Sequence, residues 1–230
     1  MKRSAEDYSA LGDMYESISE QRRLYNSAVD KQFFKVAQSV GRRWLDIGTG
    51  DGKRALRLNR ALSKELTVVE PSSLLDDIFE AKNPDVKVIR ASFESVGGSG
   101  RFDVISGLWN VVGHVESLEG FFHKAWHLLD EGGLLFFDAN SPFNVRRFGA
   151  RAALRNLLSR QTSFSFNWSS LAVSPVIFYR TSAIVAHLEA TGFSTSILYL
   201  DYENGNQVSS GFSGSVVVTA RKLPAETFPE

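Results

Sequence analysis

Three glycines at alternate positions, Gly48, Gly50 and Gly52, are the residues of this sequence whose spacing points most directly to chemistry. They follow a short apolar run that ends in Asp46, and a helix-favouring segment follows them. Glycine tolerates positive φ and has no Cβ, so the backbone of such a loop turns sharply and approaches a bound ligand closely. The pattern predicts a strand, a ligand-binding glycine loop that includes Thr49, and a helix.

The acid ahead of the loop separates two classes of cofactor. Dinucleotide-binding folds space their glycines G-x-G-x-x-G and set a pyrophosphate on the helix N-terminus, where a carboxylate immediately upstream repels the ligand. Here the spacing is G-x-G-x-G, and Asp46 stands two residues ahead of the first glycine. The segment from Asp46 to Gly52 resembles the D-x-G-x-G-x-G motif of class I SAM-dependent methyltransferases. The resemblance implies S-adenosylmethionine, which carries an ammonium and a sulfonium, as the cofactor.

A second acid supports a cofactor that contains a ribose. Glu70 ends a buried-type strand about 20 residues after the loop, where nucleotide-binding folds hold ribose hydroxyls. An ionised carboxylate accepts hydrogen bonds from both hydroxyls. We therefore expect Glu70 to bind the ribose and the adjacent Pro71 to belong to the cofactor site. We also expect Glu70 to contribute little stability to the empty fold.

The resemblance implies further cofactor contacts after the third and fourth strands. Family members usually place an acid after the third strand to bind the adenine amino group; this chain has Ser92 there, so adenine recognition is expected to use the Phe93 backbone and apolar packing. The unusually apolar segment 107–115 resembles the N-V-x-G-H stretch of small-molecule methyltransferases. Its Leu108 and Trp109 are expected to line the cofactor site, with the indole over the adenine or the sulfonium.

His114, at the end of that segment, is the expected catalytic base. An imidazole with an unperturbed pKa near 6.5 accepts a proton at neutral pH. A structural histidine bonded to the backbone is an equally good interpretation, and methyl transfer to an aligned nucleophile does not require a base.

Polar groups beside the strand ends, together with residues from the N-terminal segment, form the expected substrate side. Asn110 and Asn140 follow the fourth and fifth strands and offer amide and carbonyl groups. Arg147 belongs to an arginine-rich segment that follows them. Tyr15 and Tyr25 lie in the N-terminal segment, which folds over the cofactor in families of this type; for both, simple packing is the alternative.

The order of predicted elements is typical of an α/β fold, specifically a three-layer Rossmann-like sandwich. The mostly parallel sheet is expected to have seven strands and to end in an antiparallel hairpin, because segments 194–202 and 213–221 are joined by a plain loop. We expect a helical segment over the cofactor in 1–40 and the methyltransferase domain in 41–222. Residues 141–180 are expected to form an inserted cap, with a short amphipathic helix in 146–160 and a hairpin of strands near 163–168 and 176–179.

Composition limits the functional classes. The 230 residues contain 26 Lys and Arg, 26 Asp and Glu, and no cysteine. A balanced charge gives no general attraction to nucleic acid or to an anionic membrane, and the N-terminus has no apolar signal core. We expect a cytoplasmic monomer or homodimer. We expect no metal site, because the H-x-x-x-H spacing of His123 and His127 lacks the glutamate of metalloproteases.

The sequence thus predicts an enzyme that transfers a methyl group from S-adenosylmethionine to a small-molecule acceptor, mainly by proximity and alignment. Three alternatives stay open at this point. They are an NAD-dependent oxidoreductase, a non-catalytic module that binds S-adenosylmethionine, and an RNA methyltransferase that uses the arginine cluster.

Overall fold

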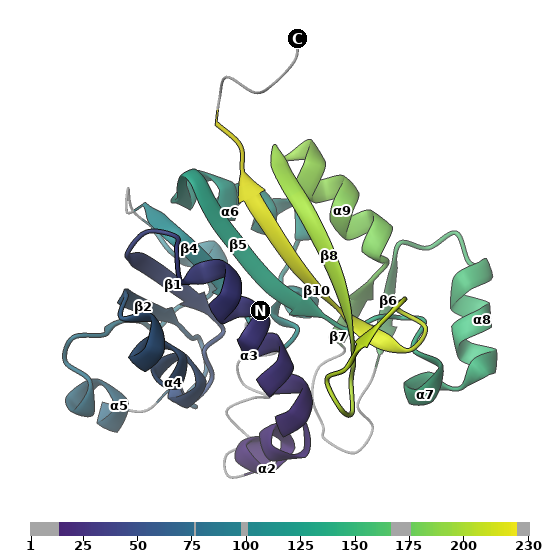
Figure 1. The fold of residues 1–230 in the computed structure, drawn as a ribbon, viewed down its shortest axis with the longest axis horizontal. Helices are drawn as coiled ribbons and strands as arrows, with labels where there is room; N and C mark the ends of the chain where they lie inside the picture. Colours follow the sequence, from purple (N-terminus) through teal and green to yellow (C-terminus); the bar gives the residue numbers. More distant parts are fainter. Residues whose placement is uncertain (1–13, 76, 98–100, 167–175, 225–230) are drawn as a thin grey trace.

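The computed structural model describes residues 14–75, 77–97, 101–166 and 176–224 and shows a central twisted sheet with helices on both faces (Figure 1). In this part of the chain the main sheet has eight strands in the order β3-β2-β1-β4-β5-β10-β8-β9. The strands are β1 Arg43–Ile47, β2 Glu65–Val69, β3 Lys87–Ile89, β4 Phe102–Gly107, β5 Leu129–Ala139, β8 Phe193–Asp201, β9 Gln207–Val208 and β10 Gly214–Lys222. Strands β3, β2, β1, β4 and β5 pair in parallel, whereas β10 is antiparallel to both β5 and β8.

This arrangement confirms the Rossmann-like fold and the antiparallel end of the sheet. The expected count of seven strands differs by one, because Gln207 and Val208 pair with the end of β8 inside a segment expected to be a plain loop. Strand β5 begins at Leu129 and runs through Gly132 and Gly133.

Two hydrophobic layers hold the helices on the sheet. Helices α3 Arg23–Ala37, α4 Lys53–Leu62 and α5 Asp77–Lys82 bury side chains against one face, and α6 Leu118–Leu128 and α9 Thr181–Ala190 bury side chains against the other. Tyr25, Val29 and Phe33 form an apolar stripe along α3, and each is at most 1% exposed. A sheet covered on both faces explains the continuous apolar run in the middle of β5.

From Met14 to Ala37, the described part of the N-terminal region contains two helices where the sequence predicted one helical segment. Helix α2 Met14–Gln21 ends before Arg22, whose backbone leaves the helical region, and α3 begins at Arg23. The break lets α2 turn over the carboxyl ends of the strands while α3 stays packed on the sheet (Figure 1). In the described residues, no helix is both long enough and apolar enough to cross a bilayer.

The segment between β5 and α9 forms a projection beside the sheet. It contains α7 Val145–Phe148, α8 Ala150–Leu158, β6 Ser163–Phe166 and β7 Val176–Tyr179. The antiparallel β6–β7 pairing agrees with the predicted hairpin, and residues 167–168 of the expected first strand lie outside the described residues. The predicted helix over 146–160 is broken at Gly149, which has a φ of 80°. We call residues 141–180 the cap.

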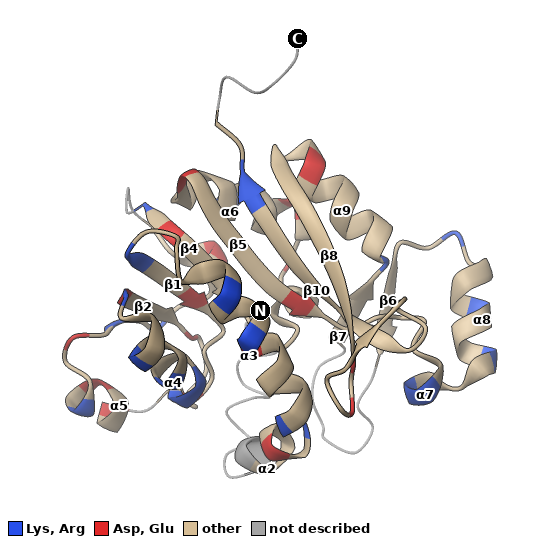
Figure 2. Cartoon of the chain, viewed as in Figure 1, with Lys and Arg blue, Asp and Glu red and all other residues tan. Residues whose placement is uncertain are grey.

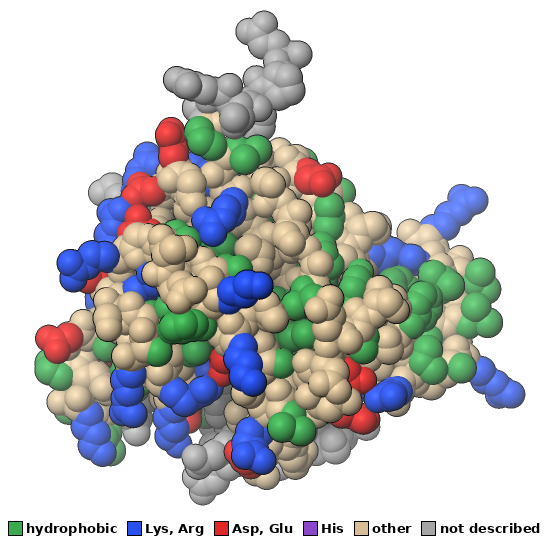
Figure 3. Space-filling model, in the orientation of Figure 1, with side chains coloured by type: hydrophobic (Ala, Val, Ile, Leu, Met, Phe, Trp, Pro, Cys, Tyr) green, Lys and Arg blue, Asp and Glu red, His purple; other side chains and the backbone are tan. Residues whose placement is uncertain are grey.

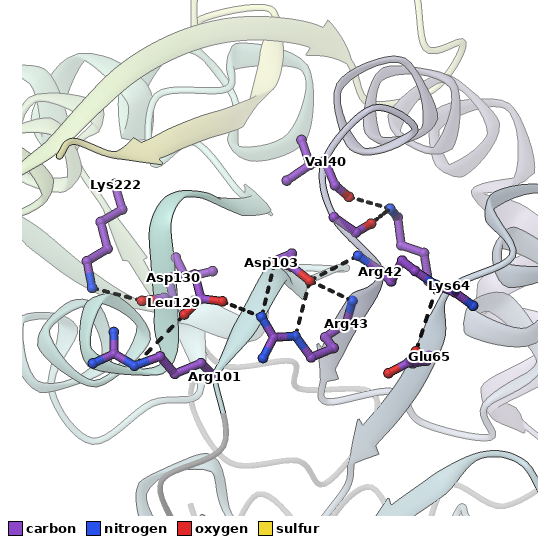
Figure 4. Close-up of polar contacts among 11 residues, drawn as sticks. Val40, Arg42, Arg43, Lys64, Glu65, Arg101, Asp103, Leu129, Asp130 and Lys222 are labelled. Carbon is purple, nitrogen blue, oxygen red and sulfur yellow. Dashed lines mark hydrogen bonds and ion pairs between the residues drawn. The ribbon is translucent and has the colours of Figure 1, made fainter.

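The amino ends of parallel strands β1, β4 and β5 are joined by polar contacts and ion pairs (Figure 4). Asp103 accepts hydrogen bonds from the backbone N–H groups of Arg42 and Arg43 at 2.9 and 2.8 Å and from the Arg43 guanidinium at 3.3 Å. Arg43 also pairs with Asp130 at the start of β5. These contacts fix the starts of β1, β4 and β5 and leave the opposite edge of the sheet for ligands.

Candidate active site

The glycine loop between β1 and α4 has the conformation that its sequence predicts. Gly48, Gly50 and Gly52 have φ values of 66°, 63° and 73°. A Cβ on Gly48 would lie 2.8 Å from a Val111 methyl group, and one on Gly52 would lie 2.1 Å from the Phe79 ring. Both backbone conformation and space therefore require glycine at these two positions.

Glu70 holds the loop from the neighbouring strand. Its carboxylate accepts hydrogen bonds from the N–H of Gly50 at 2.8 Å and from the N–H of Ser72 at 2.9 Å, and the residue is 6% exposed. Burial raises the pKa of Glu70, and these hydrogen bonds oppose the increase. The structure argues against the expectation that Glu70 adds little to the stability of the empty fold, because its carboxylate satisfies two backbone donors in the interior. A carboxylate has about four acceptor sites, so these bonds leave it able to accept from ribose hydroxyls as well.

Asp46 lies at the end of a buried hydrogen-bond chain. The indole N–H of Trp44 donates to the Ser106 hydroxyl at 2.8 Å, and that hydroxyl donates to Asp46 at 2.5 Å. Asp46 is 4% exposed, and burial raises its pKa to about 6, while the hydrogen bond from Ser106 opposes the increase. The chain fixes the carboxylate beside the loop, and burial makes its negative charge costly in the absence of a bound cation.

An arginine on α4 joins the N-terminal helix to this acidic group. Arg54 donates through Nε to the carboxylate of Asp30 on α3 at 2.8 Å, and Arg57 pairs with the same carboxylate at 2.5 Å. Burial lowers the pKa of Arg54, but the carboxylates of Asp30, Asp138 and Asp46 outweigh burial and raise it. Arg54 therefore stays charged close to two acids at the strand ends.

The loop after β4 is held in an uncommon conformation by two polar side chains. Trp109 and Asn110 have φ values of 71° and 61°, which non-glycine residues rarely adopt. Asp138 accepts from the Trp109 N–H at 2.5 Å, and Asn110 accepts through its side-chain oxygen from the Asn140 N–H at 2.8 Å. Consecutive left-handed residues of this kind are typical of functional sites, where surrounding contacts maintain the strain.

Tyr25 lies beneath this loop and supports it. Its hydroxyl donates to Asp138 at 3.0 Å, and its side chain is 1% exposed. Burial, together with the charge of Asp138, raises the pKa of Tyr25 well above its ordinary value. The structure thus favours the packing alternative for Tyr25, whereas the sequence analysis expected it on the substrate side.

Three predicted substrate residues form one hydrogen-bonded chain. Arg147 donates to the side-chain oxygen of Asn140 at 2.8 Å, and the Asn140 N–H donates to Asn110. Asn110 and Asn140 are buried, and Arg147 is half-buried. The cap is therefore connected to the ends of both β4 and β5 through these residues.

The other predicted residues occupy different surroundings. Ser92 is half-buried, with its hydroxyl 3.0 Å from that of Ser95. The Phe93 side chain lies in the core against Phe121, which leaves only the Phe93 backbone for a ligand.

Pro71 is half-buried beside Glu70. His114 is half-buried at the end of the 3₁₀ turn η2 Val111–Gly113. Tyr15 belongs to α2, and its side chain lies outside the described part.

A cavity of about 580 Å³ opens between the glycine loop, α3, α4 and the loop after β4. Asp46, Gly48, Thr49, Leu108 and Trp109 are among its lining residues. Its other charged lining residues are Glu20, Arg23, Asp51, Lys53, Arg54 and Arg57. Ligand pockets typically measure about 300–1,000 Å³, and walls of both signs fit a ligand end that carries an ammonium and a carboxylate. The described residues therefore fit the amino-acid end of S-adenosylmethionine.

Several residues of this site were not predicted from the sequence. Asp138 ends a buried strand just as Asp46 does, and that position is the signal that identifies it. Asp30 and Arg54 lie 24 positions apart, and Ser106 lies 60 positions from Asp46. No local pattern marks these three residues, because only the fold brings them together.

Comparisons with known proteins agree with this geometry. Residues 18–195 match the methyltransferase domain family known as Methyltransf_23. A solved SAM-dependent methyltransferase from Thermotoga maritima, described as a possible histamine N-methyltransferase, is similar at a TM-score of 0.69 and 16% identity, covering 95% of this chain and 99% of its own. The DhpI complex with S-adenosylhomocysteine is similar at a TM-score of 0.67 and 13% identity, covering 97% of each chain.

A third solved structure, the glycopeptide N-methyltransferase MtfA bound to S-adenosylmethionine, is similar at a TM-score of 0.60 and 14% identity, covering 86% of this chain and 94% of its own. No curated protein matches the sequence significantly. At these identities the solved structures establish the fold, and the matched domain covers most of the chain. The family match decides against the NAD-dependent alternative, and the chain belongs to the methyltransferase domain family of SAM-dependent enzymes.

Proposed function

We propose that this methyltransferase acts on a small-molecule acceptor bound at the carboxyl ends of β4 and β5, beneath the cap. The observation that carries this proposal is the position of the cap, which follows β5 directly and packs on the loop after β4. The possible histamine N-methyltransferase and the glycopeptide N-methyltransferase among the similar structures support a small-molecule acceptor. RNA is less favoured, because the chain has equal numbers of basic and acidic residues.

Close contacts attach the cap to the site. A Cβ on Gly113 of η2 would lie 2.7 Å from the Ile177 carbonyl oxygen and 2.8 Å from a Val176 methyl group, both in β7. Arg146 pairs with Asp201 at the end of β8 at 2.9 Å, and Arg147 donates to the side-chain oxygen of Asn140, which directly follows β5, at 2.8 Å. The cap is therefore held against three strand ends and limits the space open to an acceptor.

Each part of the site has a separate task in the reaction. S-adenosylmethionine supplies a methyl carbon already activated by a sulfonium, so the protein has mainly to align the acceptor and exclude water. Asp46 would hold the ammonium of the bound cofactor, and the basic side chains of α3 and α4 would hold its carboxylate. Glu70 would accept from the ribose hydroxyls. The Trp109 loop and the cap exclude water from the acceptor.

His114 is the proposed base for acceptors that lose a proton. It directly follows Gly113, which packs against Val176 and Ile177 of the cap, and therefore lies where the cap meets the loop. Replacement by Ala should lower kcat with little change in the Kd for S-adenosylmethionine. An unchanged kcat over a pH series from about 6 to 9 would assign the histidine a structural role.

The proposed function is tested in two steps. Mass spectrometry of the purified protein under native conditions should detect retained S-adenosylmethionine or S-adenosylhomocysteine. A metabolite extract incubated with the protein and methyl-labelled S-adenosylmethionine should then yield labelled products below about 1 kDa. Cofactor binding with label in no small product would favour the non-catalytic module, and label in RNA would favour the RNA methyltransferase.

A further inference from the structure

Two arginines from distant parts of the chain meet at one tyrosine ring. The guanidinium of Arg22, which precedes α3, lies 4.6 Å from the centroid of the Tyr202 ring. The guanidinium of Arg147, from α7 in the cap, lies 4.8 Å from the same centroid. Tyr202 directly follows the last residue of β8. The cluster therefore joins the N-terminal helices, the cap and the antiparallel end of the sheet.

The cluster adjoins the residues of the candidate active site. Arg22 lies 5.4 Å from the centroid of the Trp109 ring, and Trp109 lines the cavity beside the glycine loop. Arg147 donates to Asn140, the residue two positions after Asp138 at the end of β5. The Tyr202 ring packs 5.1 Å from the ring of Tyr25, which supports the Trp109 loop. A group bound between these arginines would thus lie next to the expected acceptor.

Arg147 is held in an apolar environment. Its guanidinium lies 5.3 Å from the ring centroid of Phe178 and 5.5 Å from that of Phe148. Burial and, to a smaller extent, the charge of Arg22 together lower the pKa of Arg147 to about 9. Two guanidinium groups that repel each other in such surroundings are stabilised by an anion placed between them.

The Tyr202 hydroxyl supplies a second and independent observation. The oxygen is buried and has no hydrogen-bond partner in the described part of the chain. A buried hydroxyl without a partner costs about 1–3 kcal/mol of stability, so its presence requires an explanation. A ligand oxygen that accepts its proton provides one.

We propose that Arg22, Arg147 and the Tyr202 hydroxyl bind an anionic group of the methyl acceptor, a carboxylate or a phosphate-type oxyanion. This inference rests on the proposed function, since it concerns the acceptor of the same site. A guanidinium forms paired hydrogen bonds to either kind of anion. The aromatic rings around Arg147 admit an apolar part attached to the anionic group.

Ligand binding to the full-length protein saturated with S-adenosylhomocysteine tests the proposal. Calorimetric titrations use benzoate and phenyl phosphate as anionic probes and benzamide as the neutral analogue of benzoate. At least one anionic probe should bind about tenfold or more tightly than benzamide. The Arg147→Gln variant should lose that preference, whereas Arg155→Gln, on the exposed face of α8, should keep it. Equal binding of benzamide and both anions would overturn the proposal.

Tyr202→Phe distinguishes a ligand contact from a packing role. Removing a hydroxyl that has no partner should keep or raise the Tm of the empty protein, and it should weaken binding of the preferred anion by about threefold to tenfold. Unchanged anion affinity in Tyr202→Phe would overturn the assignment of the hydroxyl. A loss of S-adenosylmethionine affinity in Arg147→Gln equal to the loss for the anion would instead assign the arginines to the cofactor carboxylate.

The labelled products separate this inference from the proposed function. Labelled small molecules that bind an anion exchanger, or that are esters of an acid, support an anionic acceptor. Labelled products that arise only from neutral or cationic acceptors would overturn the inference and leave the proposed function intact. A protein that binds no S-adenosylmethionine would refute the proposed function itself.

Discussion

Replacing Asp46 by Asn should stabilise the empty protein while weakening cofactor binding. Burial raises the pKa of Asp46 from an ordinary value of 3.8 to about 6. A carboxyl group with a raised pKa in the folded state favours the protonated form, so folding stability falls as the pH rises from about 4 to 6 and stays lower above that range. Asn keeps an oxygen that accepts from Ser106, but it has no charge to bury.

The size of the effect follows from that pKa. A difference of about two pH units corresponds to about 3 kcal/mol, since each unit is worth about 1.4 kcal/mol. Relaxation of the loop reduces this value, so we expect Asp46→Asn to gain about 1–3 kcal/mol at pH 7 and much less near pH 4. The same substitution removes the charge that receives the ammonium, and a charge-assisted hydrogen bond of about 1.5–3 kcal/mol corresponds to a tenfold to hundredfold loss of affinity.

Urea denaturation of the empty protein at pH 4.5, 5.5 and 7 measures the first effect, and calorimetric titration with S-adenosylmethionine measures the second. Asp85→Asn is the control, because it removes the same charge from an exposed turn. The free energy of unfolding of Asp46→Asn, relative to that of wild type, should increase as the pH rises from 4.5 to 7. That of Asp85→Asn should not. If Asp46→Asn is less stable at pH 7, or binds the cofactor as wild type does, then the reasoning about this carboxylate is refuted.

Three further changes test other parts of the structure. Glu70→Ala leaves the N–H groups of Gly50 and Ser72 without their acceptor. It should lower the free energy of unfolding, measured by urea denaturation, by about 2–4 kcal/mol. The control is Glu65→Ala, at an exposed residue at the start of β2, which should lower it by less than about 1 kcal/mol. Trp109→Gly should be about 1 kcal/mol more stable than Trp109→Ala, because glycine adopts a φ of 71° without strain; equal stability would exclude strain at this residue. Replacing residues 146–180 by a short Gly-Ser linker should abolish methyl transfer. In a variant that folds, the affinity for S-adenosylmethionine measured by calorimetry should stay within about threefold of wild type. A selective loss of cofactor affinity would contradict the cap assignment.

The parts of the fold that follow from local chemistry were predictable from the sequence. Positive φ at Gly48, Gly50 and Gly52 follows from the residue type, and the serine cap of α6 follows from Ser117, whose side chain accepts from the Gly120 N–H. The antiparallel end of the sheet follows from connection length alone. In each case the determinants lie within a few residues of the structure that they specify.

The interior of the site was not predictable, because its determinants are far apart in sequence. Tyr25 and Asp138 are 113 positions apart and share one hydrogen bond. Tyr25 lies on the buried face of α3, but nothing near it in the sequence shows that its hydroxyl reaches a strand-end acid. The two positive φ values at Trp109 and Asn110 are equally hidden, since both depend on Asp138 and Asn140 from the next strand.

The acids at the two ends of the parallel strands show opposite behaviour, and this difference identifies the functional edge. At the amino ends, burial would raise the pKa of Asp103, but hydrogen bonds from Arg43 and Arg42 lower it, so its charge stabilises the fold. At the carboxyl ends, burial raises the pKa of Asp46, Glu70 and Asp138 despite their hydrogen bonds. A carboxylate that only holds the fold together is most stabilising when hydrogen bonds and ion pairs fully offset the cost of burying its charge, as they do for Asp103. At the carboxyl ends, the cost of burying three acidic groups is only partly offset by the protein. A bound cation and a set of ligand hydroxyls would supply the remaining interactions, which is the arrangement expected of a binding site.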